Sequence, residues 1–136
     1  MVNTVTLSQA AKARRAVRVL VVDDNRDAMQ TLGILLRGEG YIVHLATNGT
    51  EALTTAGAFR VDVVLLDLQM PGRSGFDVAQ ELHRRYRTNC PVLIAVTAQA
   101  DTEGRARTMG FHHFVAKPYD ARGLLHLVGS LRRTIN

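Results

Sequence analysis

Five polar residues in this chain stand where short apolar runs end, and their types suit phosphate or metal chemistry. They are Asp23, Asp24, Asp67, Thr97 and Lys117. Three carboxylates offer the oxygen ligands that Mg²⁺ and Mn²⁺ prefer, and no histidine or cysteine stands beside them in the sequence to favour zinc. A hydroxyl and an ammonium can bind the oxygens of a phosphoryl group. The five together predict a site for a divalent cation and a phosphate.

The apolar runs that precede these residues alternate with amphipathic stretches from Val17 onward. This alternation predicts a β/α protein with a parallel sheet. Strands are expected at 18–23, 41–46, 62–67, 92–96 and 112–116. Helices are expected at 25–37, after Asn48, after Ser74, at 101–109 and from Asp120. Because the carboxyl ends of parallel strands border one crevice, the five polar residues are expected to meet there.

The adjacent pair Asp23 and Asp24 has two interpretations. Two carboxylates this close are costly unless a cation compensates their charge, which favours a metal once Asp67 is counted. Alternatively, one of the pair caps the helix that follows. Lys117 is one of only two lysines in a chain with 15 arginines, and its compact ammonium suits a phosphate or carboxylate partner. Thr97 could donate to a phosphoryl oxygen or simply favour the strand.

The composition limits the class of protein. A chain of 136 residues with 46% hydrophobic residues fits one folded domain, here 16–136, preceded by a flexible basic arm or linker at 1–15. The longest apolar stretches are five or six residues, whereas a membrane span needs roughly 20, so a cytoplasmic protein without a membrane segment is expected. The net charge of +5 raises the possibility of nucleic-acid binding, but the arginines are spread along the chain and direct binding is not expected.

Taken together, the motifs resemble the receiver domain of two-component response regulators over about residues 17–134. The resemblance is carried by Asp23-Asp24, by Asp67 followed by Met70-Pro71-Gly72, by Thr97-Ala98 and by Lys117-Pro118. It implies a flavodoxin-like three-layer α/β/α sandwich, with a five-stranded parallel sheet of order 2-1-3-4-5 and five helices.

The resemblance also implies roles for the site residues. Asp67 would be the phosphoacceptor, taking a phosphoryl group from the phosphohistidine of a sensor histidine kinase or a histidine phosphotransfer protein. Asp24 would bind Mg²⁺, or Mn²⁺, directly and Asp23 through water. Asp67 and the backbone carbonyl of Gln69 would complete the protein's share of the metal shell. Lys117 would pair with the phosphoryl oxygens.

The remaining implied roles concern the switch. Thr97, with Ala98, would bind the phosphoryl oxygens, and the Thr97 hydroxyl would swing onto them. Phe114 matches the family's rotating aromatic, which is buried in the active state and exposed in the inactive one. The Lys117–Pro118 bond is expected to be cis. The fourth helix, fifth strand and fifth helix would form the changed surface that controls an unidentified downstream protein.

Several alternatives stay open at this stage. Gln69 and Gln99 occupy positions that matter for the lifetime of the phosphoryl group, and neither is a strong general base. Haloacid dehalogenase-like phosphatases also use a strand-end aspartate with Mg²⁺, but they place a second aspartate where this chain has Gln69. A nucleotide-binding module would need a glycine-rich loop after the first strand, but Asp23-Asp24-Asn25 stands there instead. We therefore expect a signalling domain with at most slow self-dephosphorylation, either a stand-alone protein or a piece of a hybrid histidine kinase or phosphorelay.

Overall fold

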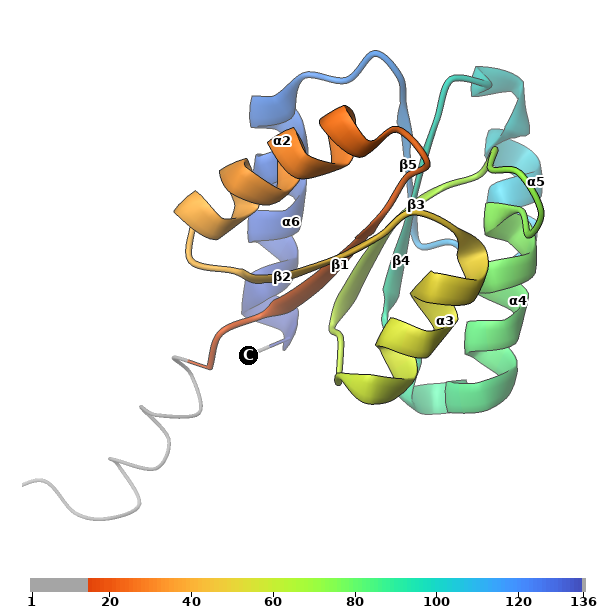
Figure 1. Cartoon of the computed structure of the whole chain (residues 1–136), viewed down its shortest axis with the longest axis horizontal. Coiled ribbons are helices and arrows are strands. Elements are labelled where there is room, and N and C mark those ends of the chain that lie inside the picture. The colour runs from red at the N-terminus through yellow and green to blue at the C-terminus, as the bar shows by residue number, and fades with distance from the viewer. Residues whose placement is uncertain (1–14, 136) are drawn as a thin grey trace, which may run out of the picture.

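The computed structural model of the protein describes residues 15–135 (Figure 1). Apart from Arg15, the predicted basic arm therefore lies outside the described residues. The strands are β1 (Arg18–Val22), β2 (Ile42–Ala46), β3 (Val63–Asp67), β4 (Val92–Thr97) and β5 (His113–Ala116). The α-helices are α2 (Arg26–Gly38), α3 (Gly49–Ala58), α4 (Gly75–Tyr86), α5 (Glu103–Thr108) and α6 (Ala121–Ile135), with 3-10 turns η1 (Arg87–Asn89) and η2 (Ala100–Thr102). Within residues 15–135, none of these helices has the length and apolar character to span a membrane.

The five strands form one parallel sheet of order β2-β1-β3-β4-β5, which confirms the predicted flavodoxin-like fold. Helices α2 and α6 cover one face and α3, α4 and α5 cover the other (Figure 1). The register aligns the carboxyl ends of the central strands, since Val22 lies beside Leu66 and Leu66 beside Ala95. Residues that follow these strands therefore emerge at one edge of the sheet.

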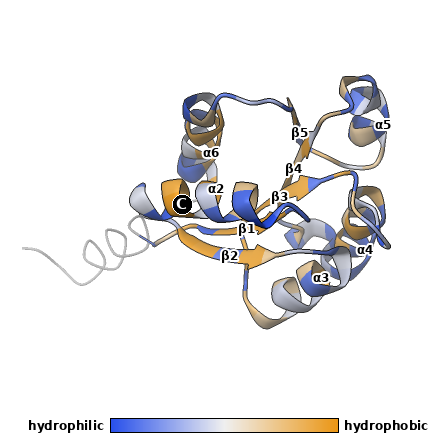
Figure 2. Ribbon diagram, turned by 45° about the horizontal axis from the view of Figure 1, so that its top comes forward, coloured by the Kyte–Doolittle hydropathy of each residue, from blue (hydrophilic) through white to orange (hydrophobic). Residues whose placement is uncertain are grey.

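The strand β3 shows why an unbroken apolar run forms a central strand here. All five of its residues are buried, and successive side chains point to opposite faces. Val63 and Leu65 join the core cluster under α2 and α6, whereas Val64 and Leu66 join the cluster under α3 and α4. The strands accordingly form the most apolar layer of the molecule (Figure 2).

The helix starts follow the capping signals of the sequence. Asn48 accepts the amide of Glu51 at the start of α3, at 2.8 Å. Ser74 and Asp77 form a reciprocal capping box at the start of α4, so both helices begin directly after the residues predicted to precede them. The predicted helix over 101–109 differs, because it begins as the 3-10 turn η2 and leaves only six residues to α5. Ala106 is the single buried residue of α5, too little apolar contact to extend the helix.

Candidate functional site

Three carboxylates meet at the carboxyl edge of the sheet. One oxygen each of Asp23, Asp24 and Asp67 lies within 4.8 Å of the others. Asp23 and Asp24 follow β1 and Asp67 ends β3, and the pairing of these strands brings the carboxylates together. The three form an oxygen-only cluster whose donors and charge suit Mg²⁺ or Mn²⁺. The structure thus brings together the acidic residues that the sequence singled out.

Lys117 reaches this cluster from the end of β5. Its ammonium nitrogen Nζ lies 2.9 Å from Oδ2 of Asp23 and 3.3 Å from Oδ2 of Asp67. The backbone amide of Lys117 donates to the carbonyl of Thr97 at 2.7 Å, which fixes the lysine beside the end of β4. The Lys117–Pro118 peptide bond is cis. One cation therefore bridges two of the three carboxylates.

The three carboxylates have different environments. Asp23 uses both oxygens within the protein, because Oδ1 accepts the amide of Asn25 at 2.9 Å and Oδ2 binds Lys117. Asp67 is buried, and its Oδ1 accepts the amide of Gln69 at 3.0 Å. Asp24 is exposed, and within residues 15–135 no hydrogen bond to its carboxylate is found. The cap of α2 is Asn25, so the interpretation of Asp23 or Asp24 as a helix cap is wrong.

The electrostatics of the cluster follow from this burial. Burial raises the pKa of the Asp67 carboxyl, and the nearby charge of Asp23 raises it further, against the amide of Gln69 and the ammonium of Lys117. Burial alone would lower the pKa of Lys117, but its bonds and attraction to the two carboxylates outweigh burial and raise it. Lys117 therefore stays protonated. Burial destabilises the ionised form of the Asp67 carboxyl, so a cation bound beside it would stabilise the folded protein.

Thr97 and its neighbours line the β4 side of the crevice. Thr97 is fully buried, and its Oγ1 accepts the amide of Gln99 at 3.2 Å rather than contacting Asp67. Ala98 is exposed directly after it. Phe114 on β5 is half-buried and packs against the core cluster under α3 and α4.

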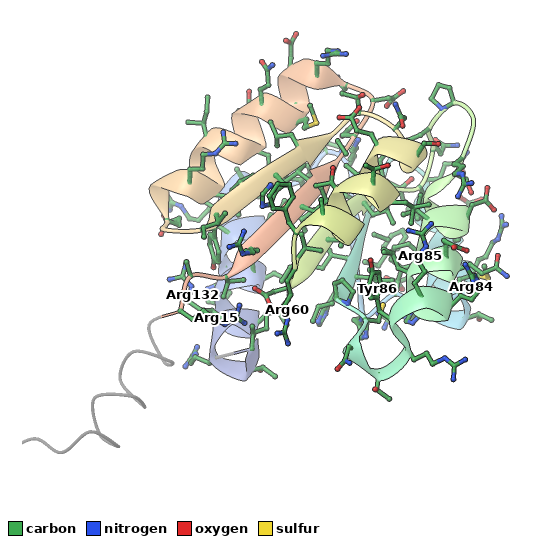
Figure 3. The ribbon with its side chains drawn as sticks, turned by 60° about the horizontal axis from the view of Figure 1, so that its bottom comes forward. Arg15, Arg60, Arg84, Arg85, Tyr86 and Arg132 are labelled. Atoms are coloured by element: carbon green, nitrogen blue, oxygen red, sulfur yellow. The ribbon has the colours of Figure 1, made fainter. Side chains whose placement is uncertain are left out.

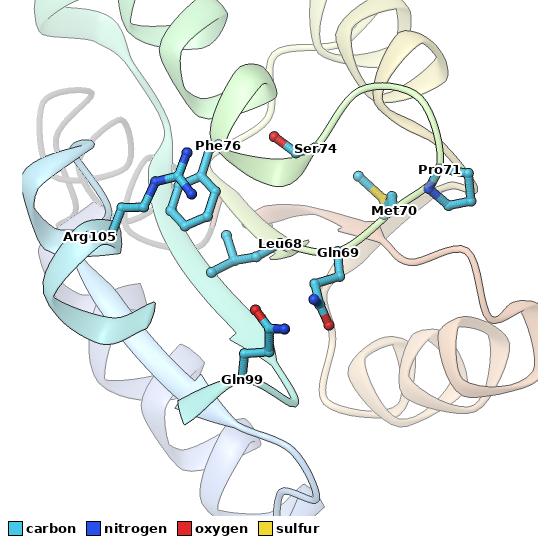
Figure 4. A pocket seen from close by; sticks show the side chains of 8 residues that line it. All are labelled: Leu68, Gln69, Met70, Pro71, Ser74, Phe76, Gln99 and Arg105. Carbon is cyan, nitrogen blue, oxygen red and sulfur yellow. The ribbon is translucent and has the colours of Figure 1, made fainter. Parts of the chain in front are cut away.

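A hollow of about 630 Å³ lies next to the crevice (Figure 4). The side chains of Gln69 and Gln99 line it, one from the loop after β3 and one from the loop after β4. Its far wall is Phe76, with the guanidinium of Arg105 stacked 4.0 Å from the ring centroid. The two glutamines therefore line this hollow with their side chains, while their backbone amides bond to Asp67 and Thr97 in the crevice.

Sequence reasoning missed two residues of this region. Gly75 opens α4 directly against the end of β3, where its amide donates to the carbonyl of Leu68 at 3.1 Å. Arg105 closes the hollow from α5. Glycine at the start of a helix is a weak signal by itself, and nothing near Arg105 in the sequence indicates its stacking partner.

Comparison with known proteins decides the family. The family model of the response regulator receiver domain matches residues 19–129. The chain belongs to the response regulator receiver domain family. The DNA-binding response regulator MtrA of Mycobacterium tuberculosis is 38% identical over 119 residues, which cover 85% of this chain and 51% of that protein. The receiver domain thus spans about half the length of the curated relatives it matches.

Solved structures agree with the family. The response regulator protein TrrA of Thermotoga maritima, in complex with Mg²⁺-BeF, has a TM-score of 0.77 and 32% identity, covering 85% of this chain and 98% of that one. The chemotaxis protein CheY4 of Vibrio cholerae has a TM-score of 0.79 and 25% identity, covering 85% and 98%. The receiver fold and its place in two-component signalling are therefore shown, and the match argues against the phosphatase and nucleotide-binding families as alternatives.

Proposed function

We propose that this receiver domain is a phosphorylation switch in which Asp67 accepts a phosphoryl group. The donor would be the phosphohistidine of a sensor histidine kinase or a histidine phosphotransfer protein. The observation that carries the proposal is the bridge from Lys117 to both Asp23 and Asp67 within the acidic cluster. A carboxylate nucleophile flanked by a fixed ammonium and by oxygen ligands for a metal suits phosphoryl transfer, which needs placement and charge neutralisation.

In the transfer step, a carboxylate oxygen of Asp67 attacks phosphorus as the bond from phosphorus to the donor imidazole nitrogen breaks. The electron pair of that bond stays with the imidazole, and Asp67 becomes an acyl phosphate. The amide of Gln69 holds Oδ1 of Asp67, so the carboxylate is oriented before the donor arrives. Asp24 and Asp67 would ligate Mg²⁺ with the Gln69 carbonyl, and Asp23 would act through water. When bound, the cation would neutralise charge on the incoming phosphoryl group.

The acyl phosphate adds about two negative charges at the edge of the sheet. Lys117 would then exchange its carboxylate partners for phosphoryl oxygens, and the Thr97 hydroxyl would turn from the Gln99 amide toward them, beside Ala98. That movement would leave space next to β5, the neighbour of β4, on which Phe114 is half-buried. The surface formed by α5, β5 and α6 would change and control a downstream protein.

Two further features support this proposal and limit it. TrrA, 32% identical to this chain, was solved with Mg²⁺-BeF, in line with a metal and a phosphoryl-like group at such a site. MtrA is described as DNA-binding, but this chain matches only 51% of it, so we assign no nucleic-acid partner to this domain. A receiver within a hybrid histidine kinase or phosphorelay remains an alternative setting for the same chemistry, and any self-dephosphorylation would be slow.

The proposal is tested by incubating the protein with Mg²⁺ and a small phosphodonor such as phosphoramidate and measuring its intact mass. We expect one added phosphoryl group, lost when EDTA removes Mg²⁺ and absent in Asp67→Asn. Asp62→Asn is the matched control, since Asp62 lies at the other end of β3 and should leave labelling unchanged. An adduct that persists in Asp67→Asn would refute the assignment.

A further inference from the structure

A second hollow, of about 620 Å³, lies at the amino end of the sheet, opposite the phosphorylation site. Three arginines line it together with Ala16 and Ile42, namely Arg15, Arg18 and Arg60. Arg18 opens β1, so about 16 Å of strand separates it from the acidic residues at the other end. Figure 3 shows Arg15 and Arg60 at this same end of the molecule.

The charges around the hollow are unbalanced. Arg15 donates to both oxygens of Asp62, at 3.1 and 3.3 Å, and that carboxylate also accepts the backbone amide of Arg18. Within residues 15–135, the guanidinium groups of Arg18 and Arg60 form no ion pair with a carboxylate. Among the described residues, the carboxylate of Asp62 is thus shared by Arg15 and the Arg18 amide, and the guanidinium groups of Arg18 and Arg60 face the hollow without a carboxylate, an arrangement that an added anionic group would stabilise.

Many other arginines of the chain already have partners inside the protein. These are Arg84 and Arg85 with Glu81, Arg107 with Glu103, Arg105 over Phe76, Arg132 over Tyr41, and Arg37 with the carbonyl of Val43. Arg18 and Arg60 differ from this group because they share a concave surface and lack such a partner among the described residues. Arg18 and Arg60 therefore form a local concentration of positive charge at this hollow.

Apolar side chains are exposed beside the same arginines. Ile42 in the hollow is 39% exposed, and Phe59, adjacent in sequence to Arg60, is 45% exposed. Phe59 stacks on His44 at 4.2 Å between ring centroids, and His44 lies two residues after Ile42 on the same face of β2. Burial, followed by the charges of Arg18 and Arg37, lowers the pKa of His44, which is consistent with a positive potential along this edge.

We propose that this pole of the domain binds an acidic segment of a partner protein in which carboxylates alternate with large apolar side chains. Carboxylates would pair with Arg18 and Arg60, and apolar side chains would cover Ile42 and Phe59. A nucleic-acid backbone fits less well, because its phosphates could pair with the arginines but would leave both apolar side chains against a charged surface. The surface is separate from Asp67, so the inference does not depend on the phosphorylation proposal.

The test is titration of the isotope-labelled full chain with a short blocked peptide of glutamates and spaced leucines, followed by amide NMR shifts and fluorescence anisotropy. We expect shifts at Arg18, Ile42 and Arg60. The double variant Arg18→Gln/Arg60→Gln should bind at least about tenfold more weakly. Ile42→Ser should weaken binding of this peptide but not of the same peptide with serine in place of leucine.

The control is Arg84→Gln/Arg85→Gln, which removes the same formal charge from α4 and should bind the peptide as the wild type does. Far-UV circular dichroism and a thermal melt of each variant report whether its fold is intact. If the double variant does not fold, Arg60→Glu on its exposed side chain should abolish binding instead. The inference would be overturned by equal losses of affinity in both double variants, by amide shifts at other residues, or by no binding at millimolar peptide. It would also be overturned if a single-stranded or duplex oligonucleotide bound more tightly than the peptide at these residues.

Discussion

Gly75 is the position where a single methyl group should damage both the fold and the site. A Cβ at this residue would overlap the backbone carbonyl oxygen of Asp67 and lie 2.8 Å from Cα of Leu68. Both are backbone atoms at the end of a buried central strand, so neither can rotate away as a side chain would. Gly75→Ala must therefore push α4 away from β3 or displace Asp67 itself.

The cost can be bounded from these contacts. Overpacking of this kind costs about 1–3 kcal/mol, and alanine recovers part of it by its lower backbone entropy cost in a helix. We expect a net loss of about 1–2 kcal/mol in the free energy of unfolding, or roughly 3–10 °C in the melting temperature. Because the displaced atom belongs to Asp67, a shift of a few tenths of an ångström should slow phosphorylation roughly tenfold.

The assay combines denaturant unfolding with the rate of phosphoryl labelling followed by intact mass. Gly104→Ala is the matched control, because it makes the same chemical change in α5 at a position with no atom within 4 Å of the new methyl. That control should be stabilised by about 0.5–1 kcal/mol and label at the wild-type rate. A Gly75→Ala protein as stable as wild type and equally quick to label would refute the reasoning.

Two further predictions concern pH. Burial raises the pKa of Asp67, so ionising this carboxyl opposes folding. Without Mg²⁺, Asp67→Asn should therefore unfold at a higher denaturant concentration than the wild type at neutral pH. The difference should shrink as the pH falls through the raised pKa of Asp67 and vanish below the ordinary pKa of aspartate, where the carboxyl is protonated in both the folded and the unfolded state. Added Mg²⁺ should stabilise only the wild type. If Asp67→Asn were less stable than the wild type at neutral pH without Mg²⁺, the argument from burial of Asp67 would be wrong. Nδ1 of His112 accepts a hydrogen bond from the backbone amide of Leu93, at 2.9 Å. Burial lowers the pKa of His112, and the charges of His83 and His113 lower it further. The free energy of unfolding should thus fall as the pH drops through about 6.5. His112→Asn, which keeps a hydrogen-bond acceptor, should make the free energy from urea titrations depend less on pH. If that pH dependence is unchanged in the variant, His112 is not its cause.

The sequence determined the secondary structure and the chemistry of the site to a large degree. The short unbroken apolar runs and the caps at Asn48 and Ser74 are local signals, and the structure follows them. The placement of the acids, Thr97 and Lys117 at strand ends is also readable, because in any parallel sheet the carboxyl ends of the strands share one edge. The one clear departure, the shortened α5, occurs where the apolar stripe was thin.

The tertiary structure alone decided which of these groups touch. That Lys117 bridges Asp23 and Asp67 depends on the register of β1, β3 and β5, set by packing of residues far apart in the chain. The same holds for the contact of Gly75 with β3 and for the convergence of Arg18 and Arg60 on one hollow. A sequence pattern fixes the direction of a side chain relative to its own helix or strand. The distance between side chains on different elements is fixed only when the core closes and determines how those elements pack.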